Sequence, residues 1–294
     1  MMNVSMVCVQ RRVGALPGNQ TTVVNVALTR RTTGRNVFFG GGSLVTTKHV
    51  LSCAHCWNRE SLSNVSIWLG VYRMSYSTFF QYKTMARSVE IHPDFDVTTL
   101  ANDIAVVRLK DEVPLWRLGG YVNTICLPPP GFKAQESAYV TGWGYLSENG
   151  PVSDVLQVVK LPLVSLDACK MLNRFRVTDT NICAGYMQGG KDACTGDSGG
   201  PMFQIIDNRA VQIAIVSWGR SCAVPNSPGV YTDVVPYLRW IHGILSADGK
   251  NNVKLSQFTT DTNGTRRRVT YVAVRQRRIR LIPVRRPLRG RAAS

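Results

Sequence analysis

The stretch from Asp192 to Pro201, which reads DACTGDSGGP, constrains this chain more than any other part of its sequence. Glycines at positions 196, 199 and 200 surround the hydroxyl of Ser198. Glycine permits backbone conformations that other residues avoid, and it lets another molecule approach the main chain closely. An attacking serine requires this, because backbone N–H groups must converge on the oxyanion that it creates. The stretch therefore predicts either a nucleophilic serine or a glycine-rich surface turn.

A serine hydroxyl is a weak nucleophile, and it needs an adjacent base that a third group orients. The chain holds four histidines, of which His55 closes the apolar run VLSCAHCW. Asp103 precedes the alternating residues of NDIAVVRL, a pattern typical of a strand. The rival arrangement, the nucleophile elbow of α/β hydrolases, needs its acid and histidine after the serine. The only histidine after Ser198 is His242, on a predicted terminal helix, so that rival is rejected.

In this order, the motifs SCAHC, NDIAVVRL and GDSGGP resemble those of trypsin/chymotrypsin-like serine proteases, over about residues 13–245. The resemblance implies an all-β fold, with two six-stranded antiparallel β-barrels of the trypsin-like type and a C-terminal helix. It implies that His55 is the general base, that Asp103 orients it, and that Ser198 attacks the scissile carbonyl to form an acyl-enzyme. The N–H groups of Gly196 and Ser198 would form the oxyanion hole.

The same resemblance implies a specificity pocket beside the serine. Asp192 matches the floor of that pocket, where a buried carboxylate favours a cationic partner that a substrate Arg or Lys supplies. Ala193 offers no hydroxyl to a lysine ammonium, which favours Arg. We therefore expect a serine endopeptidase that cleaves after Arg and after Lys. The other substrate-binding residues that the resemblance implies are Ser217, Trp218, Gly219 and Gly229.

The family also implies synthesis as a zymogen. A cut after a basic residue frees an ammonium group that pairs with the acid just before the nucleophile, which is Asp197 here. We expect the cut after Arg12, so that Val13 becomes the first residue and residues 1–12 are the remnant of a pro-segment. Leaving Asp197 buried without a cation would cost several kcal/mol.

Cysteine usage follows the family in part. The disulfides that the resemblance implies are Cys8–Cys126, Cys169–Cys183 and Cys194–Cys222. A further family pair is replaced at both positions, by Ala138 and Gln204, which leaves no single unpaired thiol.

Cys53 and Cys56 depart from the family pattern around His55. Gly40 stands where the usual partner of Cys56 would be, and Cys53 replaces an alanine. Three interpretations stay open: a short local disulfide, two packed thiols, or a redox or metal role that lacks a second pair of ligands. We expect no metal, including calcium, and no other cofactor.

Composition agrees with a secreted enzyme. Eight cysteines indicate an oxidising compartment, so we expect a secreted or secretory-granule protein, although the first residues show no secretory signal. The chain contains no apolar run long enough for a transmembrane helix. N-glycosylation sequons, which matter only in a secreted protein, occur at Asn3, Asn19, Asn64 and Asn263.

The C-terminal segment differs from the rest in charge. Residues 247–294 hold two lysines and eleven arginines against two aspartates. Such a block predicts a solvated, disordered basic tail. A functional alternative is an anionic partner such as a sulfated glycan, whereas nucleic acid is not expected.

These observations predict a domain of residues 13–245, divided into barrels at about 13–125 and 126–245, and an extension of residues 246–294. The expected partners are protein or peptide substrates with Arg or Lys at the cleaved bond and protein protease inhibitors, and we expect a monomer. One alternative is a catalytically silent homologue that binds anionic partners through the tail. A second alternative is a thiol or metal module built on CAHC.

Overall fold

The computed structural model describes residues 25–247, except 119, 149, 174 and 175, and the strands Leu255–Thr260 and Arg266–Tyr271. None of the described helices is long and apolar enough to cross a membrane. Several predicted features lie outside the described residues: Cys8, Arg12, Val13, and the sequons at Asn3, Asn19 and Asn263.

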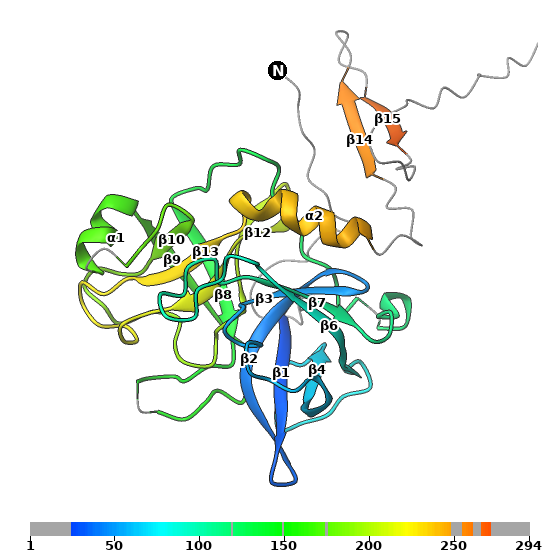
Figure 1. Ribbon diagram of the computed structural model, residues 1–294, viewed down its shortest axis with the longest axis horizontal. Coiled ribbons are helices and arrows are strands. Elements are labelled where there is room, and N and C mark those ends of the chain that lie inside the picture. The colour runs from blue at the N-terminus through cyan, green and yellow to red at the C-terminus, as the bar shows by residue number, and fades with distance from the viewer. Residues whose placement is uncertain are drawn as a thin grey trace, which may run out of the picture.

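The N-terminal half is one curled antiparallel sheet with the strand order β5-β4-β1-β2-β3-β7-β6, drawn in blue to teal in Figure 1. Its strands are β1 (Asn25–Thr32), β2 (Arg35–Thr46), β3 (His49–Ser52), β4 (Val65–Leu69), β5 (Tyr82–Thr84), β6 (Ala86–Ile91) and β7 (Ala105–Leu109), with 3-10 turns at Leu62–Asn64 and Leu115–Arg117.

This sheet corrects the prediction of a closed six-stranded barrel in the N-terminal half. It has seven strands, and its edge strands β5 and β6 are not hydrogen-bonded neighbours. Only Met85 separates β5 from β6 in the sequence. Two strands joined by one residue cannot form a hairpin, because the shortest common hairpin connection has two residues. The chain itself, rather than a ladder of hydrogen bonds, therefore joins the two edges.

The C-terminal half is a closed barrel with the strand order β10-β13-β12-β11-β8-β9, which confirms the predicted six strands for this half. The elements are β8 (Ser137–Gly142), β9 (Gln157–Val164), α1 (Leu166–Leu172), β10 (Asn181–Ala184), β11 (Pro201–Ile206), β12 (Arg209–Trp218), β13 (Gly229–Asp233), a 3-10 turn at Val235–Tyr237, and α2 (Leu238–Ala247).

The chain crosses back after β13, and α2 packs on the N-terminal half (Figure 1). Leu238 and Ile241 are buried in the same apolar core as the N-terminal sheet, and Ile244 and Leu245 pack against it. These four residues recur at helical spacing, so they lie on one face of α2.

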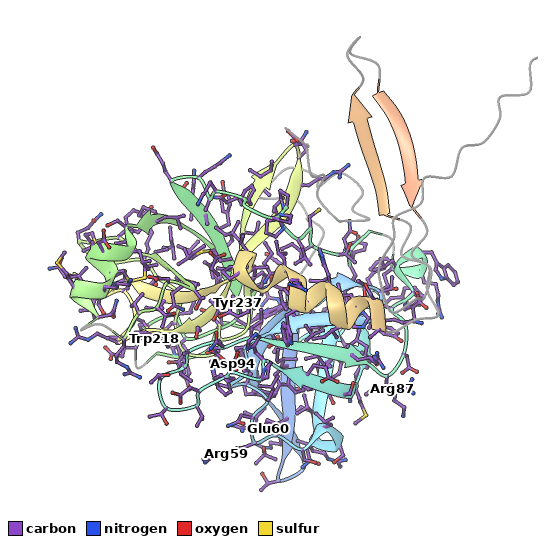
Figure 2. All side chains as sticks on the ribbon, turned by 45° about the horizontal axis from the view of Figure 1, so that its top comes forward. Arg59, Glu60, Arg87, Asp94, Trp218 and Tyr237 are labelled. Atoms are coloured by element: carbon purple, nitrogen blue, oxygen red, sulfur yellow. A yellow bond between two sulfur atoms is a disulfide. The ribbon has the colours of Figure 1, made fainter. Side chains whose placement is uncertain are left out.

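Tyr237, just before α2, ties the helix to the loop between β6 and β7 (Figure 2). Its hydroxyl donates a hydrogen bond of 2.8 Å to Oδ1 of Asn102, the residue before Asp103. The ring of His92 packs edge-on against Tyr237, with 5.1 Å between ring centroids. Burial lowers the pKa of His92. These contacts fix the loop that carries Asp103.

In the predicted basic tail, the structure describes β14 (Leu255–Thr260) and β15 (Arg266–Tyr271), which pair antiparallel with Leu255 opposite Tyr271. The prediction of a disordered tail differs from the structure at these two strands. Six-residue runs that start with Leu255 and Arg266 include several β-branched and aromatic residues, which favour extended backbone.

Candidate active site

The predicted base and its orienting acid come from two neighbouring strands. Ser52, at the end of β3, pairs with Ala105, at the start of β7. His55 follows β3 and Asp103 precedes β7, so antiparallel pairing brings the two residues to the same edge of the N-terminal sheet. The predicted nucleophile Ser198 comes from the other half, in the turn before β11. The candidate site therefore lies where the two halves of the chain meet.

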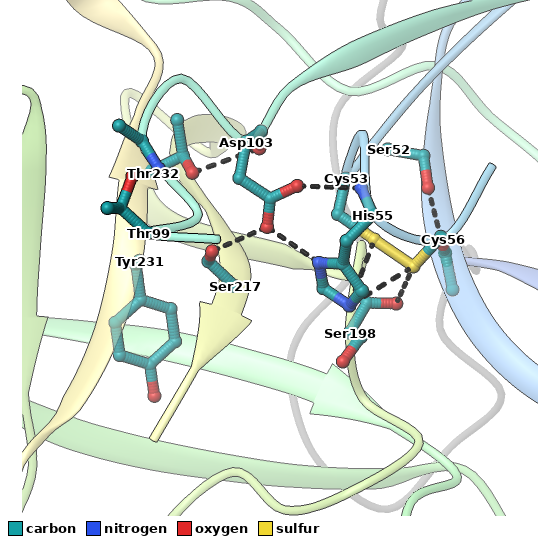
Figure 3. A network of polar contacts seen from close by, with 12 residues as sticks. Ser52, Cys53, His55, Cys56, Thr99, Asp103, Ser198, Ser217, Tyr231 and Thr232 are labelled. Atoms are coloured by element: carbon teal, nitrogen blue, oxygen red, sulfur yellow. Dashed lines mark hydrogen bonds and ion pairs between the residues drawn. A yellow bond between two sulfur atoms is a disulfide. The ribbon is translucent and has the colours of Figure 1, made fainter. Parts of the chain in front are cut away.

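Asp103 is fully buried and holds His55 at two points (Figure 3). Its Oδ2 lies 2.7 Å from Nδ1 of the imidazole, and its Oδ1 accepts a 2.9 Å hydrogen bond from the backbone N–H of His55. Ser217 Oγ donates a third hydrogen bond to Oδ2, at 2.6 Å. A carboxylate at Nδ1 favours the tautomer with the proton on that nitrogen, which leaves a lone pair on Nε2. Ser198 lies near this side of the ring (Figure 3), but no hydrogen bond joins the side chains of His55 and Ser198 among the described residues.

The main chain around Ser198 is held in a form that requires glycine. Gly196 and Gly199 have φ angles of +97° and +82°, in the left-handed region that favours glycine. A Cβ atom on Gly199 would collide with the carbonyl oxygen of Gly41. The Ser198 carbonyl itself accepts a 2.8 Å hydrogen bond from the Gly41 N–H. Ser198 is thus fixed against strand β2 of the N-terminal half.

The N–H groups of Gly196 and Ser198 are the predicted oxyanion donors. Among the hydrogen bonds of the described residues, neither of these N–H groups serves as a donor. By contrast, the neighbouring N–H groups of Asp197 and Gly199 donate to the carbonyls of Cys194 and Val216. The fold therefore satisfies the flanking amides and leaves the two predicted donors unused.

A cavity of about 290 Å³ opens beside Ser198. Its lining includes every residue that was predicted to bind substrate: Asp192, Ala193, Ser217, Trp218, Gly219 and Gly229. The disulfide Cys194–Cys222 joins two further lining segments. A Cβ atom on Gly229 would lie 3.3 Å from Oδ1 of Asp192, so a side chain there would crowd the carboxylate.

Asp192 places a desolvated carboxyl group in the lining of this cavity. Burial, together with the nearby Asp197, raises the pKa of its carboxyl group to about 6. Hydrogen bonds from the backbone N–H groups of Ala193, at 2.8 Å, and Ala223, at 3.3 Å, partly offset the burial. A carboxylate that is desolvated to this extent gains strongly from a cationic partner.

Asp197 occupies a space that two glycines provide. Its Oδ1 accepts a 2.8 Å hydrogen bond from Gly144 N–H, and its Oδ2 accepts one of 2.9 Å from Cys194 N–H. A Cβ atom on Gly142 or Gly144 would collide with its carboxylate. Burial raises the pKa of Asp197. Among the described residues no cation forms a salt bridge with Asp197, and Val13, its predicted partner, lies outside them.

Cys53 and Cys56 form a disulfide, which resolves the three interpretations of CAHC in favour of the local bond. The two sulfur atoms lie 3.7 and 3.8 Å from Nε2 of His55 (Figure 3). The structure also contains the disulfide Cys169–Cys183. Cys126 is disulfide-bonded, and its predicted partner Cys8 lies outside the described residues.

The sequence did not predict two contributions to the site, from Ser217 and Tyr231, or the role of Gln204 in the C-terminal barrel. Ser217 was predicted to bind substrate, but its hydroxyl donates to Asp103. Gln204, which replaces a family cysteine, is buried and donates to the carbonyls of Gln135 and Ser137, so hydrogen bonds take the place of the absent disulfide. Tyr231 lines the cavity, and burial together with Asp192 and Asp197 raises the pKa of its hydroxyl well above the usual value. β13 is buried over four consecutive residues, which include Tyr231, and no local pattern could have predicted that Tyr231 borders Asp192.

A buried aspartate that holds a histidine near a serine, next to a cavity lined by a carboxylate, is an arrangement that serine proteases use for acyl transfer. The sequence profile of the trypsin family matches residues 13–241. The chain therefore belongs to the trypsin family of serine proteases.

Individual relatives agree with this assignment. The chain is 37% identical to Trypsin I-P1 of Gallus gallus over 211 residues, which cover 71% of this chain and 81% of that protein. It is 41% identical to Venom serine protease Bi-VSP of Bombus ignitus over 67% of this chain and 57% of that protein. It is 38% identical to Proclotting enzyme of Tachypleus tridentatus over 68% of this chain and 57% of that protein.

Proposed function

We propose that this protein is a serine endopeptidase that hydrolyses peptide bonds after Arg, and after Lys less readily. The observation that supports the proposal is that Ser198 lies near the imidazole of His55 and also lines the cavity that contains Asp192. His55 is held by the buried Asp103, Ser198 lies beside the imidazole, and the carboxylate of Asp192 lines the same cavity.

In the proposed reaction, Ser198 Oγ attacks the scissile carbonyl carbon while its proton passes to Nε2 of His55. Asp103 stabilises the resulting imidazolium through Nδ1. The N–H groups of Gly196 and Ser198 donate to the oxyanion. His55 then gives its proton to the leaving amine, and the acyl group stays on Ser198. A water molecule, deprotonated by His55, releases the acyl group by the same steps in reverse order.

The side chain before the scissile bond would enter the cavity. A guanidinium group can form two parallel hydrogen bonds with the Asp192 carboxylate, whereas an ammonium group is a point charge. The lining at Gly219 and Gly229 lacks side chains, so a long side chain can reach Asp192. Ala193 provides no hydroxyl near the carboxylate, which favours Arg over Lys.

We further propose that the enzyme is made as a zymogen. A cut after Arg12 would free the ammonium group of Val13 to pair with Asp197. This proposal is supported by the burial of Asp197, because its two backbone donors leave a desolvated negative charge uncompensated. Secretion, a protease domain of residues 13–245, and a glycan-binding role of residues 246–294 fit the disulfides and the basic composition.

The proposed function is tested with fluorogenic peptides that differ only in the residue before the cleaved bond. After a limited cut behind Arg12, hydrolysis after Arg is expected to exceed hydrolysis after Lys, and hydrolysis after Phe or Glu is expected to be lower by about 100-fold or more. A fluorophosphonate is expected to add once, at the peptide that contains Ser198. A fully cut protein that neither hydrolyses these peptides nor takes up the phosphonate would be the silent homologue instead.

The pKa of Asp192 predicts how cationic ligands bind. An arylamidinium ion pairs with the carboxylate only when Asp192 is deprotonated, so affinity is highest above about pH 6. As the pH falls below that value, the affinity is expected to fall about tenfold per pH unit. Direct calorimetry on the Ser198→Ala protein measures this without interference from catalysis. The control is the Ser198→Ala protein that also carries Asp192→Asn, which should bind the arylamidinium ion weakly at every pH. An affinity that stays constant between pH 5 and pH 8 in the protein that retains Asp192 would contradict the prediction.

A further inference from the structure

We propose that reduction of the Cys53–Cys56 disulfide creates a zinc site, in which Cys53, His55 and Cys56 bind one Zn²⁺ ion and hydrolysis stops. The ion would take the Nε2 lone pair of His55, which the proposed reaction needs to accept the Ser198 proton. Zinc binding itself requires only the side chains of Cys53, His55 and Cys56 and does not depend on the proposed function. Its inhibitory effect rests on the proposed function.

The distances around His55 already fit a tetrahedral site. The Sγ atoms of Cys53 and Cys56 lie 3.7 and 3.8 Å from Nε2 of His55. With Zn–S bonds of about 2.3 Å and Zn–N bonds of about 2.0 Å, sulfur and nitrogen ligands of one tetrahedral ion lie about 3.6 Å apart. Only the two sulfur atoms have to move apart, to about 3.8 Å. The disulfide bond is what prevents this.

The residues behind His55 also suit a zinc ligand. A histidine that binds zinc through one ring nitrogen nearly always donates its other N–H to a carboxylate or carbonyl group. Asp103 Oδ2, 2.7 Å from Nδ1, fills that role and selects the tautomer that presents Nε2. The Ser217 hydroxyl and the backbone N–H of His55 hold Asp103 in turn. The same contacts that would orient a general base would orient a metal ligand.

Charge and access complete the site. Two thiolates would neutralise the Zn²⁺ ion, so little net charge is buried with it. Cys53 and Cys56 are 0% and 6% exposed, whereas the His55 side chain is 26% exposed, which leaves a fourth position open to water. Position 40, which would hold the usual partner of Cys56, is a glycine in this chain. The two positions are adjacent, because a Cβ atom on Gly40 would lie 3.3 Å from Cys56 Sγ. Reduction therefore yields two thiols side by side.

The redox step needs a reductant, which we take to be a dithiol. A thiolate of the dithiol attacks one sulfur of the Cys53–Cys56 bond, and its second thiol then releases the mixed disulfide. The dithiol loses two electrons and two protons and becomes a disulfide, while the Cys53–Cys56 bond gains them and becomes two thiols. Zinc binding then releases the two thiol protons to water.

The metal site is tested in the Ser198→Ala protein, which cannot digest itself. A trialkylphosphine with water reduces the disulfide and becomes the phosphine oxide, and mass spectrometry of alkylated peptides counts the thiols at Cys53 and Cys56. Titration with Co²⁺, as a coloured substitute for zinc, is expected to saturate at one ion per chain with a thiolate-to-cobalt absorption band. The control is the same protein with Cys53→Ser and Cys56→Ser, which keeps the other disulfides and should lack the band.

Inhibition is tested with the Ser198 enzyme, oxidised and reduced. Zinc is expected to inhibit the reduced enzyme at concentrations at least about 100-fold lower than the oxidised enzyme, because two of three ligands exist only after reduction. A chelator should restore the rate. Equal zinc sensitivity, a disulfide that phosphine cannot open in the folded protein, or cobalt binding without the thiolate band would overturn the proposal. A cobalt band in a protein that never hydrolyses peptides would overturn the proposed function and leave the metal site standing.

Discussion

Replacing Ser198 with alanine is expected to lower kcat for an Arg peptide by about 10⁶-fold. Alanine removes the atom that forms the acyl-enzyme, and neither His55 nor Asp103 can accept the acyl group in its place. The backbone N–H groups of Gly196 and residue 198 remain, so a small rate above that of water should persist. Single-turnover kinetics with the purified variant measures the remaining hydrolysis rate, and thereby also the loss relative to the parent enzyme.

The matched control for this variant is Ser63→Ala, at an exposed serine of the 3-10 turn Leu62–Asn64, which also loses one hydroxyl. It is expected to keep the parent kcat. If Ser198→Ala retained more than a few per cent of the activity, and contamination were excluded by active-site labelling, Ser198 could not be the nucleophile.

The Asp192→Asn variant is expected to lose about 10³-fold in kcat/KM for Arg peptides, and much less for Phe peptides. Removing one member of a desolvated ion pair leaves the substrate guanidinium buried without a counter-charge, which costs about 3–5 kcal/mol. The measurement is the ratio of kcat/KM between Arg and Phe peptides, which should collapse toward one.

Stability measurements separate this effect from misfolding. The folded-state pKa of Asp192, about 6, is raised above its ordinary value of 3.8. Its favourable contribution to stability is therefore present below the unfolded-state pKa and is lost as the pH rises through about 6. Asparagine is neutral, so at pH 8 the variant should unfold at the same or a higher temperature than the parent. Asp207→Asn, in the exposed turn between β11 and β12, is the control expected to change neither property.

Much of the fold follows from local patterns. The period-two burial of β4, with Val65, Ile67 and Leu69 inward, repeats the alternation of its sequence. The helical spacing of the apolar residues from Leu238 onward matches the face that α2 buries. The number of strands in the N-terminal sheet could not be predicted in this way. The break between β5 and β6 falls at the single residue Met85 and leaves the sheet open, and no local alternation marks it.

Some features of the candidate site could be predicted from the sequence, and others could not. His55, Asp103, Ser198 and Asp192 could be named from the sequence, because each lies in a motif of unusual residue types, and the motifs occur in a fixed order. Whether Cys53 would bond to Cys56 could not be decided, because a CxxC spacing is compatible with a disulfide, with thiols and with a metal. The structure places both sulfur atoms at the imidazole, and this contact gives the pair its proposed role.

The sequence by itself determined the family, the candidate catalytic residues and the charge of the pocket, since all three reside in short contiguous motifs. Only the tertiary structure decided that the Ser217 hydroxyl donates to Asp103, that Gln204 replaces a disulfide by binding the backbone near Gln135, and that the N-terminal sheet stays open. Ser217 and Asp103 are 114 positions apart, and Gln204 and Gln135 are 69 apart. Such contacts are set by the packing of whole sheets, about which a local pattern carries no information.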